Sequence, residues 1–302
     1  MTPSYAAMMD RVRRGEVAVL DGGIGTEMLR RGTTWEGHKV DTAADVIRAI
    51  HADYIAAGAD VITTNTFQLS RRALLNHFAG PEHMRHIGPP DLAARPAVLL
   101  REAVGRAREA REASGRDVCI AGAVTTLEWC FRPDLAPPPE QARAEYREIV
   151  EQLAAAGVDL ILFETMNHVG EAGAALEAAR EVGVPPWLAF VPRWDGRLLG
   201  REGMAEVAAI PRDLAPDVLL FNCAPPPDIQ AALREVAAHW RGILGAYAHV
   251  GRYDPPDWMF TDEYPPDRYL ACAREWRALG ARVIGGCCGT TPDHIRALCH
   301  GL

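Results

Sequence analysis

The sequence predicts a (β/α)8 barrel, in which parallel strands alternate with helices that surround them. Short apolar runs alternate with longer amphipathic stretches along the chain, and eight such units suit a length of 302 residues. We therefore expect one barrel domain over residues 1–302. An open, doubly wound sheet is the alternative fold. It is disfavoured because segment 21–25, although rich in glycine, lacks the G-x-G-x-x-G spacing of a dinucleotide site.

Strands are predicted where runs of Val, Ile, Leu, Phe and Ala are too short to form a helix. The first run stops at Asp21, and later runs stop at other polar residues or cysteines. In a barrel, these strand ends and the loops after them build the active site. In chain order, the strands are expected at residues 17–20, 60–64, 118–121, 160–163, 187–191, 218–221, 243–247 and 282–284.

Helices are predicted in the amphipathic stretches between these runs. Several stretches stop at a glycine, the residue that most readily ends a helix, as at Gly58, Gly157, Gly183 and Gly280. The same helix-to-strand hinge, Ala-Ala-Gly-x-Asp, occurs at 56–60 and again at 155–159. In chain order, the main helices are expected at residues 43–57, 98–113, 139–156, 168–182, 228–239 and 266–279.

Composition restricts the function classes. A net charge of −8 and a pI near 5.7 argue against a general nucleic-acid surface, and the arginines are scattered along helices. No apolar run approaches the ~18 to 20 residues that cross a bilayer. The first fourteen residues lack the apolar core of a signal peptide, and seven cysteines are too sparse for a disulfide framework. We expect a cytoplasmic protein with no membrane partner.

Three cysteines stand at strand ends. Cys287 and Cys288 lie between glycines after the last strand, and Cys223 closes the run 218–222. Their convergence predicts a zinc site with three thiolate ligands. Three thiolates leave the metal a poor activator of water but able to bind and deprotonate a substrate thiol, which predicts alkylation of a thiol. The other four, Cys119, Cys130, Cys272 and Cys299, are expected to be small hydrophobic residues.

With these residues in place, the chain resembles the homocysteine S-methyltransferase family. The matching motifs are Leu20-Asp21-Gly22-Gly23, the segment 58–67 ending in Thr64-Asn65-Thr66-Phe67, Phe163-Glu164-Thr165, Asn222-Cys223, and the segment 285–292, Gly-Gly-Cys-Cys-Gly-Thr-Thr-Pro. The glycine–cysteine block combined with the distant Asn-Cys is the most specific of them.

The resemblance implies that Cys223, Cys287 and Cys288 hold Zn²⁺ and that homocysteine binds beside them. Acidic side chains matching Asp21 and Glu164 would meet its amino group, and backbone amides near Gly22 and Gly23 its carboxylate. Asn65 and Thr165 are further candidate substrate-binding residues. Two alternatives stay open: Asp21 as a turn or cap residue, and Glu164 in a salt bridge to a barrel arginine.

The chain departs from the family pattern at three places. His249 replaces the usual asparagine after the seventh strand, and is either a fourth zinc ligand or a hydrogen-bonded residue at the barrel mouth. Thr165 stands where betaine-dependent relatives have tyrosine. The loop after the third strand also differs, on the side from which a methyl donor would approach, so the donor cannot be transferred from the family.

The methyl donor is expected to be a small onium compound held by aromatic side chains in the loops above the strands. Packing of these loops is the alternative role for the same residues. The long segments 66–96 and 125–139 would be covers or inserts. The donor-side candidates are Trp129, Phe131 and Trp258, with Trp35, Phe67 and Phe260 also in such loops.

The expected activity is zinc-dependent methyl transfer to homocysteine, giving methionine, with S-methylmethionine or S-adenosylmethionine favoured as donor. Alternatives are another thiol, betaine, or a methylated corrinoid carried by a separate partner protein. A further alternative is a non-catalytic zinc- or thiol-binding protein in which His249 closes the coordination sphere. The sequence is compatible with a homo-oligomer.

Overall fold

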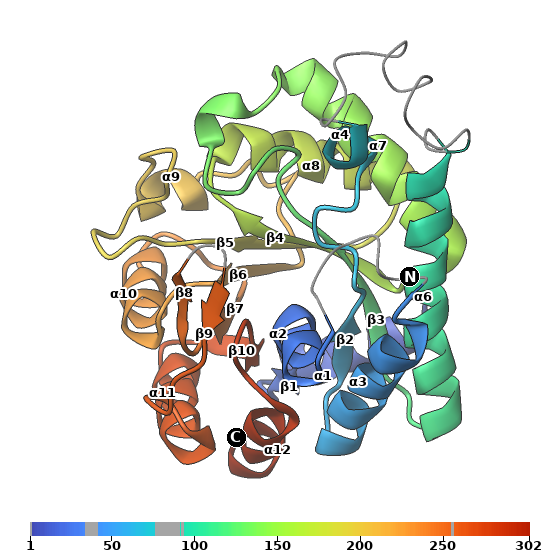
Figure 1. The fold of residues 1–302 in the computed structure, drawn as a ribbon. Coiled ribbons are helices and arrows are strands. Elements are labelled where there is room, and N and C mark those ends of the chain that lie inside the picture. The colour runs from blue at the N-terminus through green and yellow to red at the C-terminus, as the bar shows by residue number, and fades with distance from the viewer. Residues whose placement is uncertain (1, 34–41, 76–90, 92–93, 255–256) are drawn as a thin grey trace.

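The computed structural model describes residues 2–33, 42–75, 91, 94–254 and 257–302. Eight parallel strands form one sheet in the order β1-β10-β7-β6-β5-β4-β3-β2. A parallel bridge between Leu20 and Val61 joins the two end strands, which closes the barrel (Figure 1). The predicted (β/α)8 barrel and all eight strand positions are confirmed. The strands are β1 (Ala18–Val19), β2 (Val61–Thr63), β3 (Cys119–Val124), β4 (Leu160–Met166), β5 (Pro186–Phe190), β6 (Val218–Asn222), β7 (Ile243–Ala248) and β10 (Ala281–Gly286).

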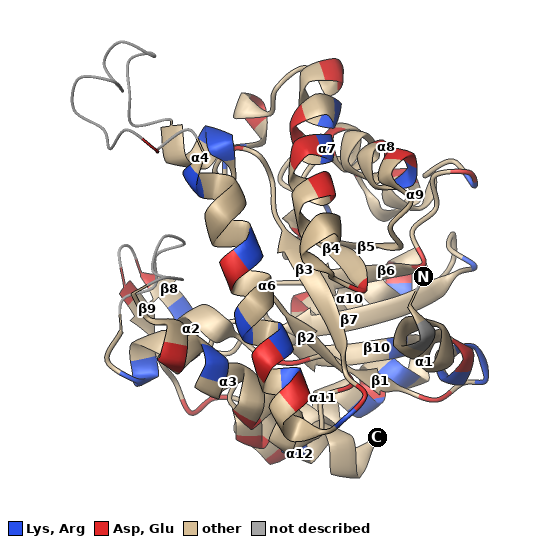
Figure 2. Cartoon of the chain, turned by 90° about the vertical axis from the view of Figure 1, so that its right-hand side faces the viewer, with Lys and Arg blue, Asp and Glu red and all other residues tan. Residues whose placement is uncertain are grey.

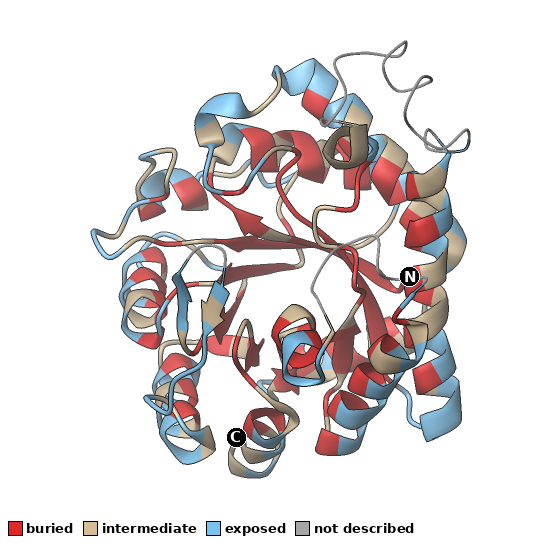
Figure 3. Cartoon of the chain, in the orientation of Figure 1, coloured by how far each residue is buried: buried red, intermediate tan, exposed pale blue. Residues whose placement is uncertain are grey.

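Helices surround this barrel, and Figure 3 shows their buried sides turned toward the strands. The six predicted helices are confirmed as α3 (Ala44–Ala57), α6 (Arg95–Ser114), α7 (Pro139–Ala156), α8 (Val169–Val182), α10 (Pro226–Val236) and α11 (Pro266–Ala278). Beyond the main predicted helices and strands, the structure contains α1 (Pro3–Arg13), α2 (Ile24–Arg30), α4 (Arg71–Leu75), η2 (Pro133–Leu135), α9 (Met204–Ala208), α12 (Pro292–Gly301) and the hairpin β8 (Arg252–Asp254) and β9 (Asp257–Met259).

Acidic and basic residues both occur along the outer helices (Figure 2), as expected for solvated faces. None of the helices in the described ranges is long and apolar enough to cross a membrane. Trp35 and residues 76–90 and 92–93 of the long segment after β2 lie outside the described residues, so the predictions made for them are not tested.

The barrel interior is closed at one end by α1. Tyr5, which is fully buried, donates a hydrogen bond to Asp217 Oδ2 (2.7 Å) and accepts one from Trp187 Nε1 (3.0 Å). Burying polar groups is tolerated here because each finds a partner. Helix α1 therefore plugs the amino-terminal end of the barrel, and the strands' carboxyl ends form the accessible mouth.

Helix α3 contains a buried histidine, and its burial predicts that the protein loses stability at acidic pH. His51 is fully buried, and neither ring nitrogen has a hydrogen-bond partner among the described residues. Burial lowers its pKa from 6.5 to about 4. Between these pH values His51 is protonated in the unfolded chain but neutral in the folded chain. The free energy of unfolding therefore falls as the pH drops from 6.5 toward 4. At pH 5 the loss is about 2 kcal/mol.

We expect a His51→Leu variant to be more stable than the parent protein at pH 5, by a larger margin than at pH 7. Urea unfolding at the two pH values measures the difference. An equal margin at both pH values would contradict this account of His51.

Candidate metal and substrate site

The sulfur atoms of Cys223, Cys287 and Cys288 lie within 4.8 Å of one another at the barrel mouth. Among the described residues, no other group of three or more His, Cys, Asp or Glu side chains comes close enough to hold a metal ion. Cys223 follows β6 directly, and the other two follow β10. Strands far apart in the sequence therefore deliver three thiols to one point, as the sequence predicted.

Hydrogen bonds among these thiols shape their ionisation. The pKa of Cys223 is raised by its hydrogen bonds with Cys287 and Cys288. The pKa of Cys288 is lowered by its hydrogen bonds with Cys223 and Cys287. The three thiols therefore influence one another's ionisation through direct hydrogen bonds. A soft divalent cation such as zinc would stabilise all three thiolates, so this donor set fits zinc rather than magnesium or calcium.

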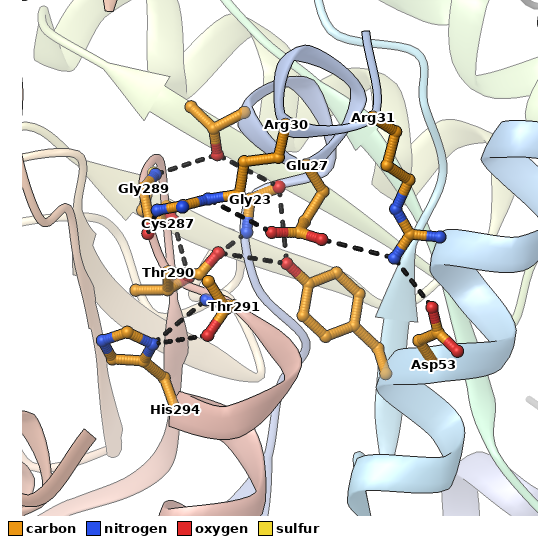
Figure 4. A network of polar contacts seen from close by, with 12 residues as sticks. Gly23, Glu27, Arg30, Arg31, Asp53, Cys287, Gly289, Thr290, Thr291 and His294 are labelled. Atoms are coloured by element: carbon orange, nitrogen blue, oxygen red, sulfur yellow. Dashed lines mark hydrogen bonds and ion pairs between the residues drawn. The ribbon is translucent and has the colours of Figure 1, made fainter. Parts of the chain in front are cut away.

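The turn that carries the two adjacent cysteines is tied to the loop after β1 (Figure 4). Thr290 Oγ1 donates to the Cys287 carbonyl (2.7 Å), and Gly23 N donates to Thr290 Oγ1 (3.3 Å). Tyr54 Oη lies 3.3 Å from the Thr290 carbonyl and 3.4 Å from that of Gly23. The metal turn and the glycine loop therefore form one rigid unit.

Arg30 links the same turn to the segment after the β8–β9 hairpin. Its guanidinium lies 4.0 Å from the ring centre of Phe260, and its Nη2 donates to the Gly289 carbonyl (3.3 Å). Glu27, almost fully buried, forms ion pairs with Arg30 (3.4 Å) and Arg31 (3.3 Å) (Figure 4). Phe260, predicted as a donor-side aromatic, instead stacks on Arg30 and does not line the cavity.

Gly289 is indispensable to this turn. Its φ is +82°, and a Cβ atom would lie 1.7 Å from the Val250 carbonyl oxygen, which is backbone and cannot swing aside. We expect Gly289→Ala to reduce zinc affinity roughly 10- to 100-fold, because displacement of the turn moves two of the three clustered cysteines. Equilibrium zinc titration measures this loss. Gly105→Ala, in helix α6 with open space around the new methyl group, is the control and should bind zinc normally.

A cavity of about 250 Å³ opens beside the three sulfurs. The six predicted substrate-binding residues and the three main donor-side candidates line it: Asp21, Gly22, Gly23, Asn65, Glu164, Thr165, Trp129, Phe131 and Trp258. Phe67 lines it as well. Sequence reasoning missed several other lining residues, including Thr63, Cys130, Tyr247 and Tyr253. No arginine or lysine of the described chain lines this cavity.

Two acidic side chains face the cavity, and neither has a cationic partner among the described residues. Asp21 accepts hydrogen bonds from the Thr63 amide (2.8 Å) and hydroxyl (3.1 Å), and Glu164 accepts one from the Tyr247 hydroxyl (3.2 Å). Burial raises the pKa of Glu164 to about 8, and burial together with the charge of Glu164 raises that of Asp21. The salt bridge considered for Glu164 is not formed within the described residues. A cationic group entering the cavity would relieve both burial penalties.

His249 lies beside this cavity rather than on its surface. Its ring packs edge-on against Trp258, with centroids 5.6 Å apart, and it is not part of the three-sulfur group. Burial lowers its pKa, opposed by the Cys287 thiol and by a hydrogen bond to the Cys223 backbone. This position supports the interpretation of His249 as a residue of the barrel mouth, and its role as a fourth ligand remains a prediction.

Aromatic rings form the outer rim of the cavity. Trp129 and Phe131 contact each other edge-on at 5.7 Å and are 43% and 48% exposed. Buried Glu171 holds their loop by accepting hydrogen bonds from the Leu127 amide (2.9 Å) and the Tyr146 hydroxyl (2.8 Å). The rim thus offers exposed π-faces on a fixed loop, an arrangement able to receive an organic cation.

A closed barrel with a thiolate cluster and an acidic, aromatic cavity at its mouth is typical of an enzyme that handles small substrates at a soft metal. The model of the homocysteine S-methyltransferase family matches residues 18–302, and the chain belongs to this family. It is an S-methyltransferase.

The chain is similar to named relatives over most of their length and to a solved structure over nearly all of it. The chain is 28% identical to homocysteine S-methyltransferase 4 of Zea mays, over 95% of this chain and 90% of the relative. It is 27% identical to selenocysteine Se-methyltransferase of Brassica oleracea var. italica, over 94% and 88%. The crystal structure of the homocysteine methyltransferase MmuM from Escherichia coli, in its metallated form, superimposes with a TM-score of 0.80 at 26% identity, over 98% of this chain and 99% of that one.

Proposed function

We propose that the protein transfers a methyl group from a small cationic donor to the thiol of homocysteine, producing methionine, with Zn²⁺ held by Cys223, Cys287 and Cys288. One observation carries this proposal: the three sulfurs face the same cavity as two carboxylates that have no cationic partner in the part of the chain that the structure describes. A ligand that joins a thiol to an ammonium group would satisfy both. Homocysteine has these groups, and relatives of this chain are named for it.

Each side chain has a defined task in this proposal. Bound zinc would supply the positive charge that keeps the substrate sulfur deprotonated and nucleophilic. Glu164 and Asp21 bind the substrate ammonium group, and Tyr247 orients Glu164 through its hydroxyl. The chain at Gly22 and Gly23 has no side chain that would block the substrate carboxylate. No general base is required for methyl transfer, because the thiol proton has already left.

The chemistry of the cavity favours a sulfonium donor, S-methylmethionine or S-adenosylmethionine. Acidic groups and aromatic faces attract a cation, and no arginine or lysine of the described residues opposes it. The positive charge disappears when the methyl group departs, so the products lose this attraction. Betaine also carries its methyl groups on a cationic centre, a quaternary ammonium group, but its carboxylate makes it a zwitterion. A methylated corrinoid on a partner protein would instead approach over the exposed rim.

The test is methionine formation by zinc-loaded protein given homocysteine and, in parallel, S-methylmethionine, S-adenosylmethionine, betaine or methylated corrinoid. We expect turnover with a sulfonium donor. Turnover only with betaine or corrinoid would overturn the donor assignment. Absence of turnover with all four, with no homocysteine binding at the metal, would favour the closed, non-catalytic zinc site, and His249→Ala would then be expected to weaken zinc binding.

Trp129 provides a test of the donor site. Each cation–π contact contributes about 0.5 to 2 kcal/mol, so Trp129→Leu is expected to raise the KM for a sulfonium donor roughly 2- to 30-fold. The KM for homocysteine should remain unchanged. Trp194→Leu is the control, because Trp194 is 80% exposed and does not line the cavity. Equal effects of the two substitutions on donor KM would remove Trp129 from the donor site.

A further inference from the structure

Asn222, on β6 next to Cys223, is hydrogen-bonded to Thr165, on β4 next to Glu164. It is the last residue of β6, fully buried, and does not line the cavity. Its Oδ1 accepts a hydrogen bond from the Thr165 amide (3.1 Å), and its Nδ2 donates to Thr165 Oγ1 (3.0 Å). Strand β5 lies between β4 and β6, so this side chain spans a strand to reach its partner (Figure 1).

A bulge in β4 explains why Thr165 and Glu164 both face the cavity. Phe163 pairs with Leu188 and Met166 with Phe190, so β4 has one residue more than β5 over this stretch. Phe163 and Met166 both belong to the core that faces the helices, whereas Glu164 and Thr165 both line the cavity. The bulge thus turns two consecutive side chains inward, as bulges near active sites often do.

Asn222 contacts two residues with strained backbone, its partner Thr165 and its neighbour Cys223. Thr165 has φ +59° and Cys223, directly after Asn222, has φ +52°. Left-handed backbone is unfavourable for any residue with a Cβ atom and especially for a β-branched threonine. Such conformations persist only where surrounding contacts impose them, and both side-chain groups of Asn222 are used on Thr165.

From this geometry we infer that Asn222 is a positioning residue that fixes the Glu164–Thr165 bulge relative to Cys223. This inference rests on the proposed function, in which Glu164 binds the substrate ammonium group and Cys223 the metal. The distance between those two points selects the amino acid whose thiol reaches the metal while its ammonium group reaches the carboxylates. Asn222 would therefore link the position of the ammonium-binding Glu164 to that of the metal-binding Cys223, without itself contacting the substrate or the metal.

The test compares Asn222→Ala, Thr165→Gly and the double variant. Asn222→Ala is expected to raise the KM for homocysteine at least 10-fold and to weaken Co²⁺ binding, followed by its thiolate charge-transfer absorption, roughly 10- to 100-fold. Glycine adopts positive φ without strain. The effect of Asn222→Ala on KM should therefore shrink at least threefold in the Thr165→Gly background.

Tyr5→Phe at the opposite end of the barrel is the control for a merely structural role. It should lower the unfolding temperature and leave both KM and Co²⁺ affinity unchanged. Unchanged KM and Co²⁺ affinity in Asn222→Ala, or additive effects in the double variant, would overturn the inference. If the parent protein failed to bind homocysteine, the proposed function would fail, whereas the Co²⁺ measurements would still test the link between Asn222 and Cys223.

Discussion

Replacing Cys287 with serine is expected to abolish stable zinc binding and to reduce methyl transfer by a factor of at least about 1000. Changes to residues that only support a ligand already cost roughly 10- to 100-fold, and this substitution would remove one of the three proposed ligands. A serine hydroxyl is a poor substitute because zinc in such sites binds deprotonated sulfur. Metal analysis after dialysis and a methyl-transfer assay measure the two losses.

Cys272→Ser provides the matched control for this change. Cys272 lies in α11, half-buried and outside the three-sulfur group, so its serine variant should keep both zinc and activity. The Cys287→Ser variant should stay folded, because the barrel core is built from strands and helices that do not need the metal. Cooperative unfolding of the barrel on zinc removal would contradict this and would indicate a structural metal.

The sequence was sufficient to predict the barrel because each strand is a short apolar run and several helices end at glycine. Gly58, Gly157 and Gly183 do cap helices in the left-handed conformation. The small elements at the mouth were missed for a physical reason: helix α2 and the β8–β9 hairpin have little apolar periodicity and are held by tertiary contacts. The Arg30–Phe260 stacking is one such contact.

The site was predictable to the extent that barrel topology places strand ends together. This rule alone places Asp21, Glu164 and the three cysteines at the barrel mouth. Tyr247 was missed although it lies inside the barrel, and strand alternation from Gly245 could have identified it as inward-facing. The left-handed Thr165 could not be predicted, because its conformation depends on a hydrogen-bond partner 57 residues away. For His249 the residue type leaves two roles open: its ring packs on Trp258 beside the sulfur group, and its role as a fourth ligand stays a prediction.

Glu164→Gln is expected to raise the KM for homocysteine roughly 30- to 1000-fold while zinc content stays at that of the parent protein. Glutamine has nearly the same shape and can still accept a hydrogen bond from Tyr247, so the change removes mainly the negative charge. Losing one partner of a buried charge pair costs about 2 to 4 kcal/mol, which gives this factor. Asp21 compensates only in part, because its carboxylate already accepts hydrogen bonds from Thr63.

The substrate analogue that lacks the amino group makes this test specific. If Glu164 binds the ammonium group, 4-mercaptobutyrate should bind the Glu164→Gln variant and the parent protein about equally, whereas homocysteine should discriminate strongly. Glu177→Gln, on the exposed face of α8, removes the same charge away from the cavity and should leave both affinities unchanged. An equal loss of affinity for the two ligands in the Glu164→Gln variant would instead show that Glu164 acts on the thiol end of the site, through the cysteines, and the ammonium group would then have to be held by Asp21 alone.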